Sequence, residues 1–252
     1  MKKMEEVINR PEPGAYQTTL GELLREAAVL IITALAICLF SQNTKIMSIV
    51  FAAIVIFRFV FFNRRGDVIF FLMGVILGGG NDLMSMWRGV YYYTPATILP
   101  VPIPVWMLLF WGEIFVFFRK LIRYGPFLRP ETPRKRLLDL PLALDIILFA
   151  VYRIIIYRYA SVPWLPDALY AGILVARLLL LPPKTDERKL MITILLLGPV
   201  YEIALIRCGL YVYQNGFIWG LPLWLIIWWV FIIRVFKAII DRIEHSVATR
   251  LS

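Results

Sequence analysis

Two carboxylic acids at matching positions in the chain are the first candidates for chemistry. Asp82 and Glu202 lie 120 positions apart, each toward the end of a long apolar segment. A charged side chain at the centre of a bilayer costs at least about 2.5–3.5 kcal/mol, so such acids face a bundle interior and are functional candidates. Burial raises the pKa of a carboxyl, so it could stay protonated near neutral pH and act as an acid. The structural alternative is that both acids only join helices or pair with intramembrane arginines.

Each acid is followed at the same distance by a glycine and two alternating tyrosines. The pattern Gly-x-Tyr-x-Tyr begins seven residues after each acid, and a further glycine precedes each acid by four residues. If these segments are extended, the two tyrosines of each pair share one face. The tyrosines are Tyr91 and Tyr93 in the first segment and Tyr211 and Tyr213 in the second. An aromatic belt at the membrane surface is the alternative explanation.

The residues around the acids predict an aromatic-lined pocket. Ring faces stabilise cations by about 0.5–2 kcal/mol each. Glycines and prolines near both acids favour a locally broken helix that lines a cavity. Asp82 and Glu202 are the predicted catalytic residues of this pocket. The predicted substrate-binding residues are Asn81, Trp87, Tyr91, Tyr93, Trp106, Tyr211, Tyr213 and Trp228.

The sequence offers little for metal or nucleophile chemistry. The single histidine, His245, lies in the C-terminal tail, so the chain lacks the residues for a His/Cys metal site, a Ser-His-Asp triad or a Cys-His dyad. Carboxylate-only metal sites stay open, although no Asp-rich cluster of the kind that holds magnesium in prenyl transfer is present. We predict no metal and no cofactor. Cys38 and Cys208 fall near the same end of their segments, so one bridge is possible, but inert apolar packing is the prediction.

Composition indicates that lipid is the solvent for most of the surface. Of the 252 residues 60% are hydrophobic and the mean hydropathy is +0.75, whereas soluble domains are usually about 45–50% apolar. The net charge of +10 does not indicate nucleic acid, because lysines and arginines gather in alternate loops between apolar segments. This positive-inside pattern predicts that both termini are cytoplasmic and that the basic residues contact anionic headgroups.

Eight apolar segments are long enough to cross a membrane as helices, which needs about 20 residues each. They cover residues 24–41, 45–62, 67–87, 103–121, 139–158, 166–183, 189–211 and 222–241. The 120-residue offset lays the first four over the last four, which predicts an all-α protein of two parallel four-helix repeats. The predicted organisation is a polar segment 1–23, a first repeat 24–121, a basic linker 122–138, a second repeat 139–241 and a tail 242–252.

The order of acid, Gly-x-Tyr-x-Tyr, proline and tryptophan resembles the polytopic carotenoid hydratases. The residues that carry it are Asp82, Gly89 to Tyr93, Pro102 and Trp106, and again Glu202, Gly209 to Tyr213, Pro222 and Trp228. Those proteins look like relatives of the membrane lycopene cyclases and the membrane-bound terpene cyclases, whose intramembrane acids protonate an alkene or epoxide. The match covers a short part of each half, lacks the Pro-x-Glu-Glu motif of the lycopene cyclases and has Asp82 where a glutamate is expected.

Taken together, the residues and the resemblance predict a cofactor-independent terpenoid or carotenoid hydratase or cyclase. Asp82 or Glu202 would protonate a polyprenoid from the bilayer, and aromatic faces would stabilise the carbocation. The alternative is a transporter or lipid carrier with its site at the repeat interface, and a lipid-packed scaffold stays open as well. Expected partners are a hydrophobic polyprenoid or lipid, membrane lipids and a possible second copy. The expected location is a prokaryotic cytoplasmic membrane.

Overall fold

The computed structural model describes residues 16–95, 97, 100–128 and 138–249, and within this part the chain is helical apart from two short strands. Two single-turn segments are a π-helix, η1, over Gly74–Gly78 and a 3₁₀ helix, η2, over Gly125–Phe127. The strands are β1 (Tyr91–Tyr93) and β2 (Tyr211–Tyr213). The α-helices are α2 (Leu20–Phe40), α3 (Thr44–Phe61), α4 (Asp67–Met73), α5 (Gly79–Trp87), α6 (Val105–Ile122), α7 (Leu140–Tyr159), α8 (Leu165–Leu180), α9 (Thr185–Arg207) and α10 (Leu223–Thr249).

Six of the described helices are long and apolar enough to cross a membrane, which confirms the prediction of a multi-pass integral membrane protein. They span Leu20–Phe40, Thr44–Phe61, Asp67–Trp87, Leu140–Tyr159, Thr185–Arg207 and Leu223–Ile243. The predicted fourth and sixth spans also form helices, α6 and α8, but neither is long and apolar enough by the same criteria. Helix α8 has only 16 residues, and α6 carries Glu113, Arg119 and Lys120.

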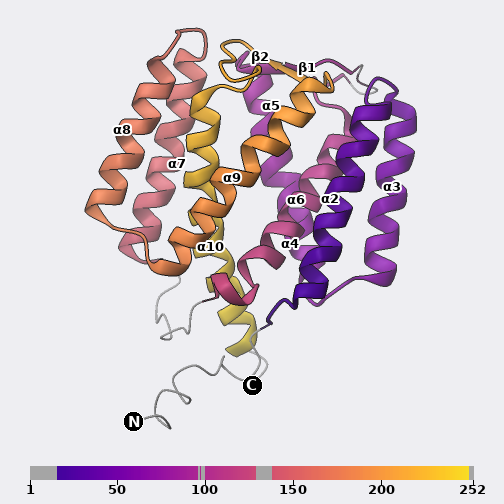
Figure 1. The fold of residues 1–252 in the computed structure, drawn as a ribbon, viewed down its shortest axis with the longest axis horizontal. Helices are drawn as coiled ribbons and strands as arrows, with labels where there is room; N and C mark the ends of the chain where they lie inside the picture. Colours follow the sequence, from indigo (N-terminus) through magenta and orange to yellow (C-terminus); the bar gives the residue numbers. More distant parts are fainter. Residues whose placement is uncertain (1–15, 96, 98–99, 129–137, 250–252) are drawn as a thin grey trace.

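The helices form two groups, each built around one central helix (Figure 1). Helix α6 is largely buried and packs against α2, α3, α4 and η1, while α10 packs against α7, α8 and α9. The two central helices also contact each other, and α2 contacts α9, which joins the groups. Helix α10 runs on to Thr249, so part of the predicted C-terminal tail is helical.

The two strands lie at one end of the bundle, which we call the strand end; the opposite end, where α2 begins and α6 ends, is the basal end (Figure 1). Strands β1 and β2 pair antiparallel, with Tyr91 opposite Tyr213 and Tyr93 opposite Tyr211. Each strand follows a glycine with a positive φ, +68° at Gly89 and +73° at Gly209. Because L side chains rarely adopt this conformation, these glycines allow the chain to turn sharply from helix into strand.

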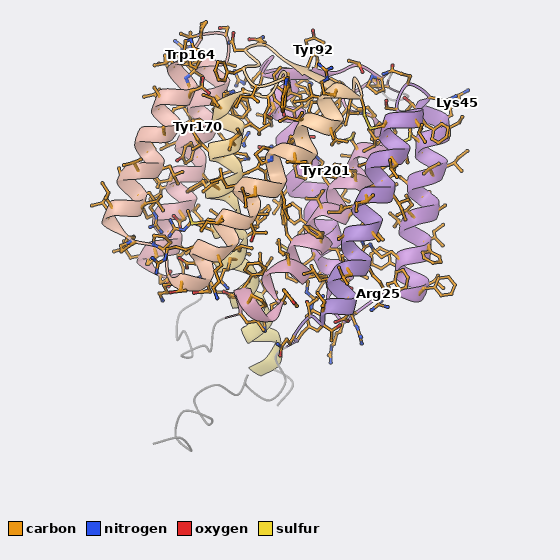
Figure 2. The ribbon with its side chains drawn as sticks, in the orientation of Figure 1. Arg25, Lys45, Tyr92, Trp164, Tyr170 and Tyr201 are labelled. Carbon is orange, nitrogen blue, oxygen red and sulfur yellow. A yellow bond between two sulfur atoms is a disulfide. The ribbon has the colours of Figure 1, made fainter. Side chains whose placement is uncertain are left out.

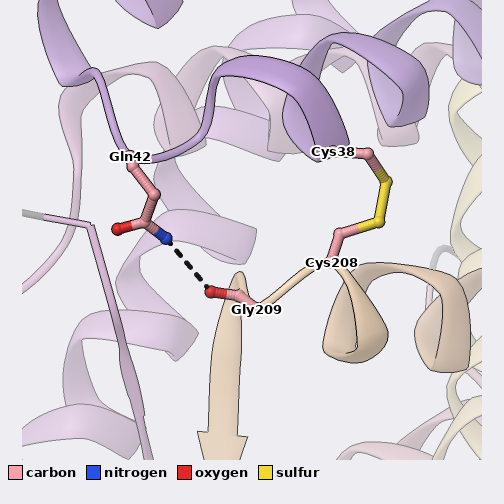
Figure 3. The surroundings of a disulfide bond; sticks show 4 residues. All are labelled: Cys38, Gln42, Cys208 and Gly209. Atoms are coloured by element: carbon pink, nitrogen blue, oxygen red, sulfur yellow. Dashed lines mark hydrogen bonds between the residues drawn. A yellow bond between two sulfur atoms is a disulfide. The ribbon is translucent and has the colours of Figure 1, made fainter.

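A disulfide joins Cys38 of α2 to Cys208 at the end of α9 (Figure 3). The prediction of inert packing for these cysteines is therefore wrong. Sequence alone placed both at one end of the bundle but could not show that α2 and α9 are neighbours there. Near the bridge, the Gln42 side chain donates a hydrogen bond to the Gly209 carbonyl at 3.5 Å (Figure 3). These contacts fix α2 to the start of β2 at the strand end.

Buried ion pairs occupy the basal half of the first helix group. Arg58 bridges two acids, Glu26 at 2.7 Å and Glu113, and all three side chains are almost completely buried. Asp67 is completely buried between Arg119 and Lys120, which lies 3.0 Å away. In the second group, Asp145 pairs with Arg177 at 2.7 Å. Buried charges of this kind need direct counter-ions, because desolvation is otherwise too costly.

Candidate functional site

A cavity of about 510 Å³ lies between the two helix groups, closed at one end by the strands. Its volume falls within the range of about 300–1,000 Å³ that is usual for small-molecule sites. Helices α2, α5, α6, α9 and α10 form its walls, and both strands contribute side chains. The residues with polar side chains that line it are Asp82, Tyr91, Tyr93, Trp111, Tyr201, Glu202, Tyr211, Tyr213 and Trp229.

Asp82, on α5, is held by three hydrogen-bond donors. The Tyr91 hydroxyl donates to Oδ1, the Tyr93 hydroxyl donates to Oδ2, and the Trp111 indole Nε1 donates to Oδ2 at 2.6 Å. The carboxyl is almost completely buried, with 3% of the residue exposed. All three partners are neutral, so this acid has no direct ion pair among the described residues.

Glu202, on α9, has a similar but less complete set of donors. The Tyr211 hydroxyl donates to Oε2 and the Trp229 indole Nε1 donates to Oε1 at 3.0 Å. The Tyr213 hydroxyl, which also lines the cavity, makes no hydrogen bond to any residue in the described part of the chain. Glu202 therefore keeps acceptor capacity on the cavity side, because a carboxylate offers about four lone-pair sites.

The four strand tyrosines pack ring against ring above the acids. Ring centroids lie 5.1 Å apart for Tyr91 and Tyr213 and 5.7 Å apart for Tyr93 and Tyr211. Burial raises the pKa of Tyr91 well above its usual value, and the neighbouring Asp82 raises it further. Burial and Glu202 act in the same direction on the pKa of Tyr211. The hydroxyls consequently stay protonated near neutral pH and act as donors to the carboxyls.

Glycines on the third helical segment bring Trp111 up to Asp82. A Cβ atom at Gly74 would lie 2.3 Å from the Trp111 carbonyl oxygen, and one at Gly78 would lie 2.5 Å from the indole ring. Contacts this short do not occur in proteins, so only glycine permits this approach between η1 and α6. In the Gly78–Gly80 run that precedes Asp82, Gly78 and Gly79 thus serve close helix packing, whereas a Cβ atom at Gly80 would meet nothing within 4 Å.

The structure brings together six of the ten residues predicted from the sequence and leaves four outside the cavity lining. Both acids and all four tyrosines line it. Trp87 is 63% exposed, and the backbone carbonyl of Asn81 accepts a hydrogen bond from the Ser85 hydroxyl. Trp106 is completely buried against Phe51. The fourth, Trp228, packs in the second helix group. The predicted binding role of these four residues is not supported by their positions.

Two tryptophans that bind the acids, Trp111 and Trp229, were not among the predicted site residues. They hold equivalent places, each seven residues after the proline that directly precedes its helix, Pro104 or Pro222. The offset of 120 pairs Pro222 with Pro102 instead, because the connection from β1 to α6 is two residues longer than that from β2 to α10. Aligning the helix starts at an offset of 118 would have identified both residues.

One arginine lies close behind the tyrosines without a direct acidic partner. Arg153 of α7 is 8% exposed, and its guanidinium carbon lies 3.7 Å from the centroid of the Trp228 ring. Its Nε has no hydrogen-bond partner in the described structure. Arg153 attracts Asp82 electrostatically over a longer distance. The side chain does not line the cavity, so it forms a second layer behind the strands.

The cavity opens sideways, toward the surface that faces lipid. Ile31 of α2 and Leu197 and Val200 of α9 line it and are also 60%, 58% and 68% exposed, respectively. Tyr201, next to Val200 on α9, donates a hydrogen bond to the Leu30 carbonyl of α2 at 3.4 Å. Figure 2 shows Tyr201 about midway between Tyr92 at the strand end and Arg25 near the basal end. A lipid in the bilayer could therefore reach the acids without crossing an aqueous phase.

No cluster of three or more His, Cys, Asp or Glu side chains able to hold a metal occurs among the described residues. The two cavity acids are bound to tyrosine and tryptophan donors. The arrangement as found is suited to binding the polar end of an organic molecule.

Comparisons with known proteins show the fold and correct the predicted family. The chain is similar to an Insig homologue, MvINS, from Mycobacterium vanbaalenii, with 20% identity and a TM-score of 0.55 over 74% of this chain and 97% of that one. A cross-linked MvINS trimer gives 21% identity and a TM-score of 0.56 with the same coverage. Residues 145–249 match a family model described as a protein of unknown function, DUF2878. No curated protein matches the chain.

These findings overturn two predictions made from the sequence. The resemblance to carotenoid hydratases and cyclases is wrong, because the fold is that of an Insig homologue and nothing among the matches belongs to those families. The predicted acid-initiated hydratase or cyclase loses its support with it. The motif of acid, tyrosines and proline marks a structural unit, a carboxyl capped by the strand that follows it. The chain has an Insig-like membrane fold.

Proposed function

We propose that this protein is a lipid-binding membrane protein that takes one amphiphilic lipid from the bilayer into the cavity. The observation that carries this proposal is the distribution of polarity along the cavity. Its carboxyls and strand tyrosines lie at the strand end, and its remaining walls are aliphatic and aromatic side chains. A lipid bound there would place its head group at the strand end and its chain toward the basal end.

The length of the cavity suits a lipid chain. On α6 the lining runs from Met107 to Leu121, which corresponds to about 21 Å along the helix at 1.5 Å per residue. The apolar residues along this stretch include Phe110, Ile114 and Phe118. Burial of apolar surface supplies roughly 25 cal/mol per Å², so the walls favour a hydrocarbon chain strongly.

The side opening between α2 and α9 favours a lipid carrier or lipid-binding protein over a transporter that moves solute across the membrane. Ile31, Leu197 and Val200 line the cavity and are more than half exposed on the surface. An opening at this place offers exchange with one bilayer.

We also propose the finer topology predicted from the sequence. The matching order of helices and strands in the two halves supports eight spans in two parallel repeats, with α6 and α8 as the spans beyond the six established ones. Basic residues at the basal end and the disulfide at the strand end support cytoplasmic termini in a prokaryotic membrane. The trimeric MvINS structure supports a homo-oligomer.

Photo-crosslinking tests the proposed function. A long-chain alcohol bearing a diazirine would be added to the purified protein in bilayer nanodiscs, and labelled peptides would be mapped by mass spectrometry. We expect labelling of the α9 segment from Leu197 to Leu205. The variant Gly198→Phe fills the cavity, because Gly198 lines it with its nearest side-chain neighbours 3.7 Å or more from a Cβ atom. We expect labelling to fall at least about fivefold there.

The matched control is Gly172→Phe on α8. Gly172 does not line the cavity, and a Cβ atom there would meet nothing within 4 Å. Labelling in this variant should equal that of the unmodified protein. Labelling confined to outer surfaces, or equal in both variants, would overturn lipid binding in the cavity.

A further inference from the structure

We propose that the lipid taken by this cavity carries a single positive charge, as a protonated amine, at its head group. The inference rests on the proposed lipid-binding function and specifies the chemical class of its ligand. Four observations carry it: the groups hydrogen-bonded to the two carboxyls, the lack of a direct counter-ion among the described residues, the aromatic surroundings, and the free hydrogen-bonding capacity of Glu202 and Tyr213.

Both acids are held by groups that suit the ionised form. An indole N–H can only donate, and such groups donate to Oδ2 of Asp82 and Oε1 of Glu202. The other oxygen of each acid, Oδ1 of Asp82 and Oε2 of Glu202, is hydrogen-bonded to a tyrosine hydroxyl. Burial disfavours a carboxylate without a counter-ion, so a cation beside these groups would stabilise the ionised form.

Neither acid of the strand end has a direct counter-ion among the described residues. Arg153, whose guanidinium lies over the Trp228 ring, does not line the cavity. A buried carboxylate without a counter-ion is costly. A monocation in the cavity would supply the counter-ion that one carboxylate needs.

The aromatic side chains around the acids suit the same ligand. Tyr91, Tyr93, Tyr211 and Tyr213 lie on one side of the carboxyls and the stacked rings of Trp111 and Trp229 on the other, with centroids 6.4 Å apart. Electron-rich ring faces attract ammonium groups, most strongly where water is excluded. An anionic head would meet the two carboxylates first, because Arg153 does not line the cavity.

Glu202 and Tyr213 supply the acceptors that an ammonium group needs. Glu202 receives two donors against three for Asp82, and the Tyr213 oxygen has no hydrogen bond to any described residue. A primary ammonium offers three donors and no acceptor. Glu202 is thus the acid in direct contact with the head group, and Asp82 acts through its charge.

Competition against the diazirine alcohol used above tests the head-group class. Hexadecylamine, hexadecanol and hexadecyl phosphate share one chain and differ only at the head. We expect the amine to displace the probe from the cavity at a concentration at least about tenfold below that of the alcohol, with the phosphate weakest. Glu202→Gln should remove most of the preference for the amine over the alcohol.

Glu187→Gln is the matched control, since it makes the same change on the same helix, about 22 Å from Glu202 by helical rise. This variant should keep the preference for the amine. Cavity labelling with equal competition by amine and alcohol, or with the phosphate strongest, would overturn the cationic head group and leave lipid binding intact. Absence of cavity labelling would instead overturn the proposed function, and this inference with it.

Discussion

The strand end and the basal end of this protein both bury acidic side chains, but they hold them differently. At the basal end, three acids meet three bases directly: Glu26 and Glu113 with Arg58, and Asp67 with Arg119 and Lys120. At the strand end, two acids meet neutral tyrosine and tryptophan side chains, and Arg153 does not line the cavity. Acids with direct counter-ions join helices, whereas acids held by neutral groups around a cavity remain available to a ligand.

Among the variants that test this comparison, Arg58→Met should have the largest effect on stability. The substitution leaves Glu26 and Glu113 buried without their cation, which should lower the free energy of unfolding by about 3–5 kcal/mol. Arg153→Met is the matched control, because Arg153 is also buried but has no direct ion pair in the described structure. The decrease in unfolding free energy should be clearly smaller for Arg153→Met than for Arg58→Met. Denaturant titration in mixed micelles measures both, and equal losses would contradict the distinction between the two ends.

Loss of the disulfide should affect the strand end and spare the basal end. Because the Cys38–Cys208 bridge connects residues separated by 170 positions, the double variant Cys38→Ser with Cys208→Ser should lose about 2–4 kcal/mol of unfolding free energy. Protease accessibility near Gly209 should rise, while that near Asp67 should not change. Uniform loosening of both ends would show that the bridge stabilises the bundle as a whole.

The smallest expected effect is the difference in stability between two tyrosine variants of strand β2. Tyr211→Phe removes a hydrogen bond to the Glu202 carboxylate and should cost about 1.5–3 kcal/mol of unfolding free energy. Tyr213→Phe removes a hydroxyl that has no partner in the described part of the chain, so stability should change by less than about 0.5 kcal/mol. Tyr213→Phe should still weaken binding of the amine. A larger stability loss for Tyr213→Phe than for Tyr211→Phe would contradict the assigned contacts.

Much of the site could be predicted because it is built from residues close to one another in sequence. Asp82 and the strand that donates to it are separated by one turn, and the same holds for Glu202, so their spacing survives in both halves. Trp111 and Trp229 come from the next helix, beyond connections of unequal length, and a single offset could not find them. The Cys38–Cys208 contact depends on the docking of α2 against α9, which leaves no local pattern.

The fold class could be predicted from composition, but the family and function could not. Apolar segments of about 20 residues indicate membrane-spanning helices directly, because the thickness of the bilayer sets their length. Asp82 and Glu202 among aromatic rings are compatible with protonating an alkene, which needs a neutral carboxyl, and with holding a cation, which needs a carboxylate; ring faces suit both. The structure adds the partners of each carboxyl, and the likeness to an Insig homologue shows the fold.

The disulfide also has a consequence for how the chain is assembled in the membrane. Its first cysteine lies in α2, and its second follows α9. The bond can therefore form only after the seven α-helices from α3 to α9 have been synthesised. Until then Cys38 remains a free thiol, and an early bond within this chain is excluded because Cys208 is its only other cysteine. The bridged form therefore marks chains in which both halves have been inserted and docked. Electrophoresis without reductant would separate these chains from incompletely assembled ones.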